Sequence, residues 1–231
     1  MKIASWSGPR NISTALMYSF AARGDTLVQD EPFHASYLAM ARIDPPARSR
    51  VLSATENDPR RVIARFDQGT PHLYLKLMAQ HMIDGIDLDW AEEFFHLHLV
   101  RHPARVIASY AAKRQLPTLE ELGYPRQLEI FERFGGVVVL TSDIRAQPEK
   151  MLRRICDRIG LEFTPRMLRW PPGGHIAGGS WAAHRYGGSH ASSTFLGAEG
   201  DVPELEGDEA HVCADAMAYY DALGAHLLSP D

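Results

Sequence analysis

The sequence predicts an α/β fold of three layers, in which a central parallel β-sheet is flanked by helices. Two observations carry this prediction. Short apolar strands alternate with helical segments along most of the chain, a pattern typical of parallel sheets. Residues 137–140 are entirely apolar and mostly β-branched, as expected of a strand that is buried on both faces. Ligands of such sheets bind beyond the carboxyl ends of the strands, so those ends are where a site is expected.

The individual elements follow from local signals. The first helix is rich in alanine, has Leu16 and Phe20 four residues apart, and ends before Gly24. Pro103 and Pro148 stand at first-turn positions that favour helix starts. Strands are predicted at 2–7, 26–28, 73–77, 94–100 and 137–140. Helices are predicted at 13–22, 58–68, 103–114, 148–159 and 208–227, with a loop over 42–60 and an irregular lid or loop over 171–203.

Composition limits the class of protein. A chain of 231 residues is long enough for a substantial core, and we expect a single domain over residues 1–231. A net charge of −5 and a pI near 6.1 argue against nucleic acid or a membrane surface as partner. The sequence has no apolar run long enough for a membrane span, so none is predicted. Cys156 and Cys213 lie in apolar helical patterns, so we expect reduced, buried thiols and a cytoplasmic location.

The turn that joins the first strand to the first helix is the most informative segment. A helix N-terminus presents unpaired backbone N–H groups and a positive partial charge. Here a glycine, a cationic side chain and two hydroxyls surround that N-terminus, which predicts a site for an anion, most often phosphate. The residues expected to bind it are Gly8, Pro9, Arg10, Asn11, Ile12, Ser13, Thr14 and Ala15.

This turn does not match the loop of nucleoside triphosphatases, GxxxxGK[ST]. Aligned on Gly8, the chain has Ser13 in place of the second glycine and Thr14 in place of the lysine that bridges the β- and γ-phosphates. ATP hydrolysis is therefore not expected.

Two motifs resemble those of sulfotransferases. The run PRNISTAL at 9–16 is similar to their 5′-phosphosulfate loop, P-[KR]-S-G-[ST]-T-x-L, with Asn11-Ile12 in place of Ser-Gly. The run LVRHPARVIASY at 99–110 resembles their 3′-phosphate motif, with Arg101 leaving a strand and Ser109 about two helical turns later. The guanidinium of Arg101 is a fork of donors that suits a phosphate.

A third stretch, 142–161, looks like the family's strand–E-D-L–P-E–helix segment, so the resemblance covers residues 3 to about 170. It is similar to bacterial sulfotransferase-like proteins with an SGPRN-type loop. It implies a P-loop-like fold and 3′-phosphoadenosine 5′-phosphosulfate (PAPS) as co-substrate. The family's R-K-G segment, which adds cations at the 3′-phosphate, is missing. His175, His184 and Arg185 lie in the corresponding region and are expected to substitute for it.

Sulfuryl transfer needs positioning, charge stabilisation and a base. The resemblance implies that Arg10 contacts the bridging oxygen of the leaving group. Two residues compete as the base: His81, whose imidazole titrates near neutral pH, and Glu31, which follows the second strand. Lys76 either orients the sulfuryl group or projects into solvent.

We expect no metal. His96 and His98 lie on one strand face with His102 nearby, but a third ligand at convincing spacing is missing. The resulting hypothesis is a sulfotransferase acting on a hydroxyl or amine of a small molecule. Two alternatives stay open: a nucleotide-dependent kinase on a related fold, and a nucleotide-binding homologue without catalysis. The acceptor and the oligomeric state do not follow from the sequence.

Overall fold

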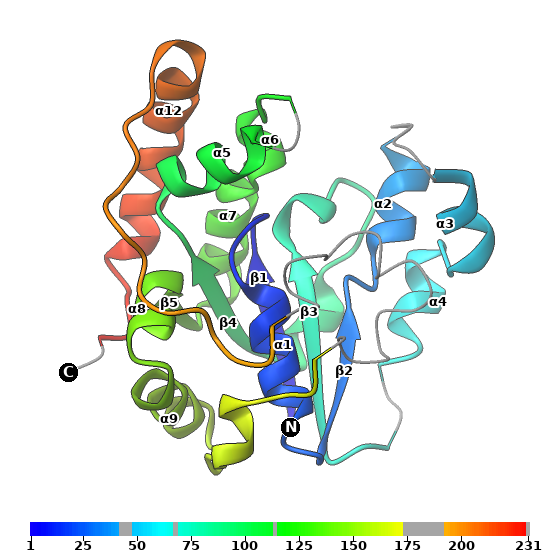
Figure 1. Cartoon of the computed structure of the whole chain (residues 1–231). Coiled ribbons are helices and arrows are strands. Elements are labelled where there is room, and N and C mark those ends of the chain that lie inside the picture. The colour runs from blue at the N-terminus through cyan, green and yellow to red at the C-terminus, as the bar shows by residue number, and fades with distance from the viewer. Residues whose placement is uncertain (42–47, 67–68, 113–114, 173–191, 230–231) are drawn as a thin grey trace.

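Five parallel strands form one sheet in the computed structural model, in the order β2–β3–β1–β4–β5 (Figure 1). The structure describes residues 1–41, 48–66, 69–112, 115–172 and 192–229. The predicted parallel sheet is confirmed, and each predicted strand is present within two residues of its expected bounds. The strands are β1 (Lys2–Ser7), β2 (Thr26–Asp30), β3 (His72–Met78), β4 (Phe95–Val100) and β5 (Val137–Leu140).

Helices cover both faces of the sheet because alternate strand residues point to opposite sides. On one face, Ile3 and Tyr74 pack in a core with Phe20 of α1 (Ser13–Ala21) and Ile155 of α9 (Pro148–Ile159). The other face carries an apolar core of its own. Its members include Trp6 and Leu75 from the strands, Val62 of α4 (Pro59–Ile63) and Ile130 of α7 (Tyr124–Phe134).

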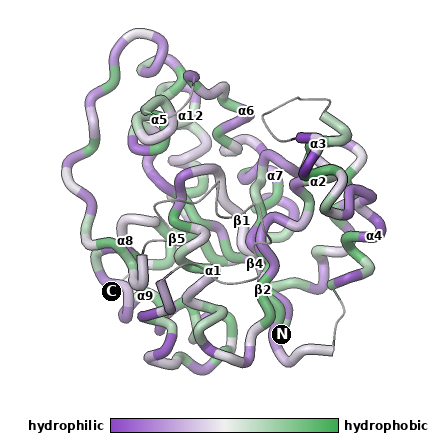
Figure 2. The backbone as a smooth tube through the Cα atoms, turned by 45° about the vertical axis from the view of Figure 1, so that its right-hand side comes forward, coloured by the Kyte–Doolittle hydropathy of each residue, from purple (hydrophilic) through white to green (hydrophobic). Residues whose placement is uncertain are grey.

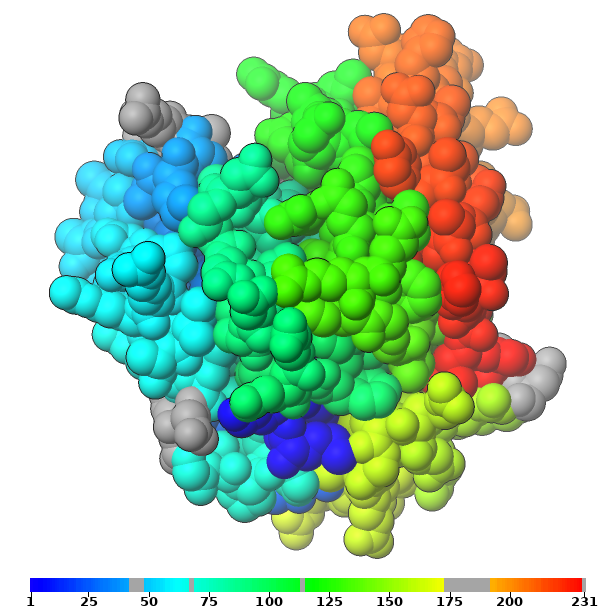
Figure 3. Space-filling model, turned by 180° about the vertical axis from the view of Figure 1, so that it is seen from behind, coloured from blue at the N-terminus to red at the C-terminus, as the bar shows by residue number. Residues whose placement is uncertain are grey.

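A third core lies beside β4 and β5. It joins α5 (Pro103–Ala111), α7 and the long helix α12 (Gly207–Gly224), which packs against both. Figure 3 shows this side from behind, with α7 across the middle and α12 along the edge. Figure 2 shows the hydrophobic segments gathered in the sheet and hydrophilic residues on peripheral elements such as α4. In the described part of the chain, no helix is both long and apolar enough to cross a membrane.

Several short helices correct the predictions. The expected loop over 42–60 is wrong for its later part, because α3 (Arg48–Ala54) forms there and buries Val51 against Leu38 of α2 (His34–Met40). The helix predicted over 58–68 is the much shorter α4. The helices that the sequence did not indicate are α2, α3, α6 (Leu119–Leu122), α7 and α8 (Thr141–Ala146), with the 3₁₀ turns η1 (Ala79–His81), η2 (Asp89–Glu93) and η3 (Pro165–Leu168).

The two cysteines differ in their surroundings. Cys156 is fully buried in the α9 core, and burial raises its pKa to about 11. Cys213 lies in α12 and is only half-buried, so the expectation of a buried thiol is wrong there. Both are free thiols.

Candidate functional site

The loop between β1 and α1 has the backbone shape of an anion nest. Arg10 (φ 61°) and Ile12 (φ 48°) adopt left-handed conformations, whereas Asn11 between them does not. Such alternation turns successive N–H groups toward one point. Ile12 is the N-cap of α1, and no side chain caps this helix end. The left-handed conformation is costly for a β-branched residue, so strain is stored in the loop itself.

Two residues, Gly8 and Asn11, hold the loop in this shape through contacts that the sequence did not indicate. A Cβ on Gly8 would lie 2.2 Å from the carbonyl oxygen of Leu122, so only glycine allows the α6–α7 corner to approach. Asn11 is 2% exposed; its Nδ2 donates to the carbonyl of Pro9, and its Oδ1 accepts from the hydroxyl of Thr141 at 3.4 Å. Asn11 therefore anchors the loop to Thr141, the first residue of α8 directly after β5.

The two motifs that are predicted to bind anions meet in space, although about 90 residues separate them. Arg101, just beyond β4, donates from Nη1 to the carbonyl oxygen of Arg10 at 2.8 Å. Arg10 in turn donates from Nε to Oγ of Ser109 at 2.8 Å. Because β1 and β4 are neighbours in the sheet, their carboxyl ends bring both motifs to one edge. Ser13 and Thr14 are buried in the first turn of α1, directly after the loop.

A buried ionic cluster lies at the same edge, toward β2. Asp30 and Lys76 are register partners in β2 and β3, so both side chains emerge on one side. The Lys76 ammonium lies 2.8 Å from Asp30 Oδ1 and 2.7 Å from Glu31 Oε1, and all three side chains are at most 4% exposed. The Lys76 ammonium thus contacts two carboxylates rather than solvent. Glu31 has φ 47°, a further strained position at the site.

His81 is buried at 4% exposure at the end of η1, rather than on the surface. Its ring stacks on Tyr37 at a centroid distance of 4.7 Å and lies 5.0 Å from the ring of His34. Glu31, His34 and His81 each offer a ligand atom within 4.8 Å of the others. Both candidate bases are therefore in one cluster, together with His34, which sequence reasoning missed. Burial raises the pKa of Tyr37.

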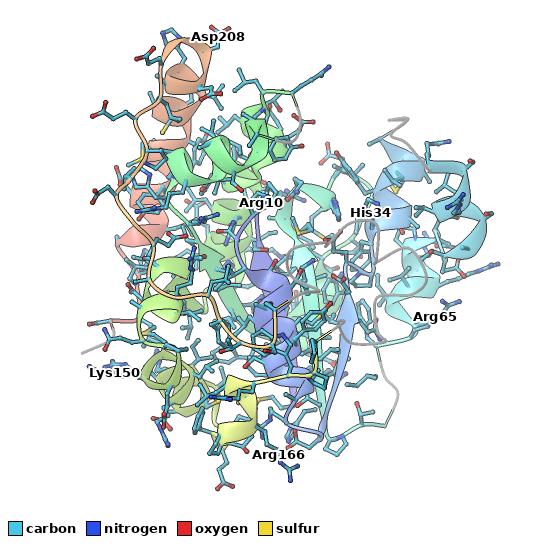
Figure 4. All side chains as sticks on the ribbon, in the orientation of Figure 1. Arg10, His34, Arg65, Lys150, Arg166 and Asp208 are labelled. Carbon is cyan, nitrogen blue, oxygen red and sulfur yellow. The ribbon has the colours of Figure 1, made fainter. Side chains whose placement is uncertain are left out.

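The cluster of Glu31, His34 and His81 has the donor set of a zinc or other divalent transition-metal site. The same groups also suit proton transfer, because two imidazoles lie beside a carboxylate that contacts an ammonium. Figure 4 shows Arg10 and His34 near the upper edge of the sheet, where the loop and this cluster lie. The only sequence signal for His34 was its position three residues after Glu31, and its backbone N–H donates to the Glu31 carbonyl.

The strand histidines are core residues. Trp6 Nε1 donates to His96 Nδ1 at 2.9 Å, which leaves the His96 Nε2 proton for the carbonyl of Ala91 at 3.1 Å. His98 Nε2 lies 3.1 Å from the carbonyl of Gly135, and burial lowers the pKa of His98 to about 3. His102 caps α5 by accepting from Ala104 N–H.

The residues expected to replace the R-K-G segment, His175, His184 and Arg185, lie outside the described residues. Among those described, two other arginines gather beside Arg101. Arg105 of α5 and Arg145 of α8 both contact the carboxylate of Glu199, as Arg101 does. Sequence reasoning did not single out these residues, because they come from three distant segments.

Comparison with known proteins gives the family. The family model described as "Sulfotransferase domain" matches residues 1–227. Two solved structures share the fold. The sulfotransferase domain from the Synechococcus PCC 7002 olefin synthase is 17% identical, with a TM-score of 0.59 over 99% of this chain and 96% of that one. The sulfotransferase domain from the curacin biosynthetic pathway is 15% identical, with a TM-score of 0.55 over 94% and 97%.

Two Arabidopsis thaliana proteins also match, the branched-chain-amino-acid aminotransferase-like proteins 1 and 2, at 33% and 30% identity over 201 residues. The alignments cover 84% of this chain but only 36% of theirs, so the chain spans about a third of the length of these relatives. Because the family model matches nearly the whole length, the chain belongs to the sulfotransferase domain family.

Proposed function

We propose that this protein transfers a sulfuryl group from PAPS to a hydroxyl or amine of a small molecule. The observation that supports this most is the meeting of two anion-binding motifs at one edge of the sheet, through the bonds of Arg101 to Arg10 and of Arg10 to Ser109. A nucleotide with phosphates at both its 5′ and 3′ ends needs two adjacent anion sites of this kind.

In the proposed reaction, the nest and the first turn of α1, with Ser13 and Thr14, hold the 5′-phosphate. The acceptor oxygen or nitrogen attacks sulfur, and the bond from sulfur to the bridging oxygen breaks. The electron pair of that bond stays on adenosine 3′,5′-bisphosphate, where Arg10 stabilises the developing charge.

The acceptor's proton passes to a base in the cluster beside Lys76. We assign this role to His81, because Oε1 of Glu31 already contacts the Lys76 ammonium at 2.7 Å. Glu31 then stabilises the imidazolium that forms, as a carboxylate beside a catalytic histidine does. The buried ionic cluster fixes the position of Glu31, since both partners of the ion pair are shielded from water.

The test is transfer of radiolabelled sulfur from PAPS to a panel of hydroxyl and amine acceptors, with release of adenosine 3′,5′-bisphosphate. His81→Asn is expected to lower the rate at saturating PAPS about 100-fold or more. The matched control is His211→Asn, on an exposed position of α12, which leaves the rate unchanged.

Each alternative predicts a different result. Binding of the bisphosphate without transfer to any acceptor indicates a homologue without catalysis. Tighter binding of ATP with magnesium than of the bisphosphate indicates a kinase. An unchanged rate in His81→Asn contradicts the assignment of the base.

A further inference from the structure

A single carboxylate lies among three arginines at the β4–β5 end of the site. Glu199 Oε1 accepts from Arg101 Nε at 2.9 Å, from Arg101 Nη2 at 2.6 Å and from Arg145 Nη1 at 2.7 Å. Arg105 Nε lies 3.2 Å from Oε2. The Glu199 side chain is 4% exposed, and each arginine side chain is about 15% exposed.

The charges in this cluster do not balance. Three guanidinium groups face one carboxylate, so the cluster keeps a formal excess of two positive charges. Arginine pairs with phosphate oxygens through parallel hydrogen bonds, and a phosphate monoester carries nearly two negative charges at neutral pH. A phosphate would therefore match the three arginines in charge better than Glu199 does.

The segment that carries Glu199, residues 192–206, has no regular secondary structure and crosses the molecule before α12 begins (Figure 1). Its first part is anchored, because Phe195 is buried against Trp170 and the Trp170 N–H donates to the Ser193 carbonyl. Between Phe195 and Leu205 the apolar side chains are not buried: Leu196 is 60% exposed and Val202 is 45% exposed, whereas Leu205 packs against the core beside β4 and β5.

The contacts of this second part are to the same arginines. Arg145 Nε donates to the Gly197 carbonyl at 2.9 Å, and Arg105 Nη2 donates to the Gly200 carbonyl. An added Cβ on Gly197 or Gly200 would meet no other atom within 4 Å. The arginines thus hold residues 196–204 locally, and this stretch ends at Leu205, which packs against the core beside β4 and β5.

We propose that Arg101, Arg105 and Arg145 form the binding site for the phosphate monoester at the 3′ end of the nucleotide, and that Glu199 is an internal competitor which this phosphate displaces. The inference rests on the proposed function. It assigns binding roles to Arg105 and Arg145, which supply the cations that the missing R-K-G segment would have provided.

The position of Arg101 supports a shared site. Its Nη1 contacts the carbonyl of Arg10 in the 5′-phosphate loop, while Nε and Nη2 contact Glu199. The side chain of Arg101 therefore contacts both the 5′-phosphate loop and the Glu199 carboxylate in the three-arginine cluster. This arrangement suits a ligand whose two phosphates belong to one nucleoside.

The experiment compares two nucleotides that differ only in the 3′-phosphate. Calorimetry measures binding of adenosine 3′,5′-bisphosphate and of adenosine 5′-phosphate to the wild type, to Glu199→Gln and to Arg145→Ala. The matched control is Glu204→Gln, an exposed glutamate on the same segment.

Glu199→Gln is expected to bind the bisphosphate about tenfold more tightly, because the competing charge is gone, and to leave the affinity for the monophosphate within about twofold. Arg145→Ala is expected to weaken binding of the bisphosphate about tenfold and to leave the affinity for the monophosphate within about twofold. Unchanged or weaker bisphosphate binding in Glu199→Gln overturns the inference, as does an equal effect of Arg145→Ala on both nucleotides.

A second measurement uses only the unmodified protein. Hydrogen exchange of the amides in 196–204 is expected to speed up when the bisphosphate binds, because the segment leaves the arginines. Slower exchange in the complex would overturn the displacement. Failure of the proposed function looks different: neither the wild type nor Glu199→Gln binds the bisphosphate. Transfer from PAPS with no effect of Glu199→Gln on binding refutes the inference alone.

Discussion

Replacement of Lys76 by methionine tests the buried ionic cluster at the candidate acceptor side of the site. Lys76 lies 2.8 Å from Asp30 and 2.7 Å from Glu31, and none of the three side chains is more than 4% exposed. Methionine keeps the length of the chain but removes the ammonium, which leaves two carboxylates buried without it. Breaking a buried ion pair in this way costs about 3–5 kcal/mol of the free energy of unfolding.

For a chain of this size, such a loss lowers the midpoint of thermal unfolding by about 6–20 °C. The matched control is Lys2→Met. Lys2 pairs with Glu93 at 3.1 Å, but the two side chains are 32% and 76% exposed, so about 0–1 kcal/mol is expected. Urea unfolding followed by circular dichroism gives the free energy of unfolding of each variant.

A double variant separates charge from packing. If uncompensated charge causes the loss, Asp30→Asn added to Lys76→Met restores part of the stability, because one buried carboxylate is gone. A loss of stability in Lys76→Met no greater than that in Lys2→Met, or a further loss when Asp30→Asn is added to Lys76→Met, would refute a role for the buried charges.

Three other predictions concern the loop, the buried histidines and the metal-like cluster. Gly8→Ala is expected to lower the free energy of unfolding by about 1–3 kcal/mol and to weaken nucleotide binding, because the new Cβ would lie 2.2 Å from the carbonyl oxygen of Leu122. The control is Gly224→Ala, whose Cβ would meet no atom within 4 Å. Equal stability of the two variants would contradict the clash. His98 has a folded-state pKa of about 3, below the value near 6.5 of the unfolded chain, so the unfolded state binds more protons between these values and stability falls as pH drops below 6.5. From pH 7 to pH 5 this amounts to about 2 kcal/mol in urea titrations, and His98→Gln should remove that part of the slope. Zinc is expected to inhibit transfer by occupying Glu31, His34 and His81, with recovery on adding EDTA; inhibition that persists unchanged in His34→Ala would show that zinc acts elsewhere.

Four strands, β1, β3, β4 and β5, could be predicted because each is largely apolar and mostly buried. The edge strand β2 is only partly buried and could be predicted only over residues 26–28. The short helices could not. The helix α3 has a polar, arginine-rich sequence, and it forms where Val51 packs on Leu38 of α2, a contact between segments whose pairing the sequence does not state. Tertiary packing outweighs local propensity in elements of this length.

The candidate site divides in the same way. The anion-binding residues could be found because motifs after β1 and β4 must meet at the carboxyl edge of a parallel sheet. His34 could not be found, since its proximity to His81 depends on how α2 folds back. The contact between Arg145 and Glu199 likewise could not be predicted, because it depends on the path of the irregular segment 192–206, which has no periodic sequence pattern.

The central claim is that one nucleotide with phosphates at both ends binds across the loop and Arg101. Calorimetry of adenosine 3′,5′-bisphosphate with the wild type and with Arg101→Ala tests it most directly. Loss of a charged, bidentate contact worth about 1.5–3 kcal/mol predicts at least about tenfold weaker binding in the variant. Equal affinity of the two proteins, or no binding by either the wild type or Glu199→Gln, would contradict it.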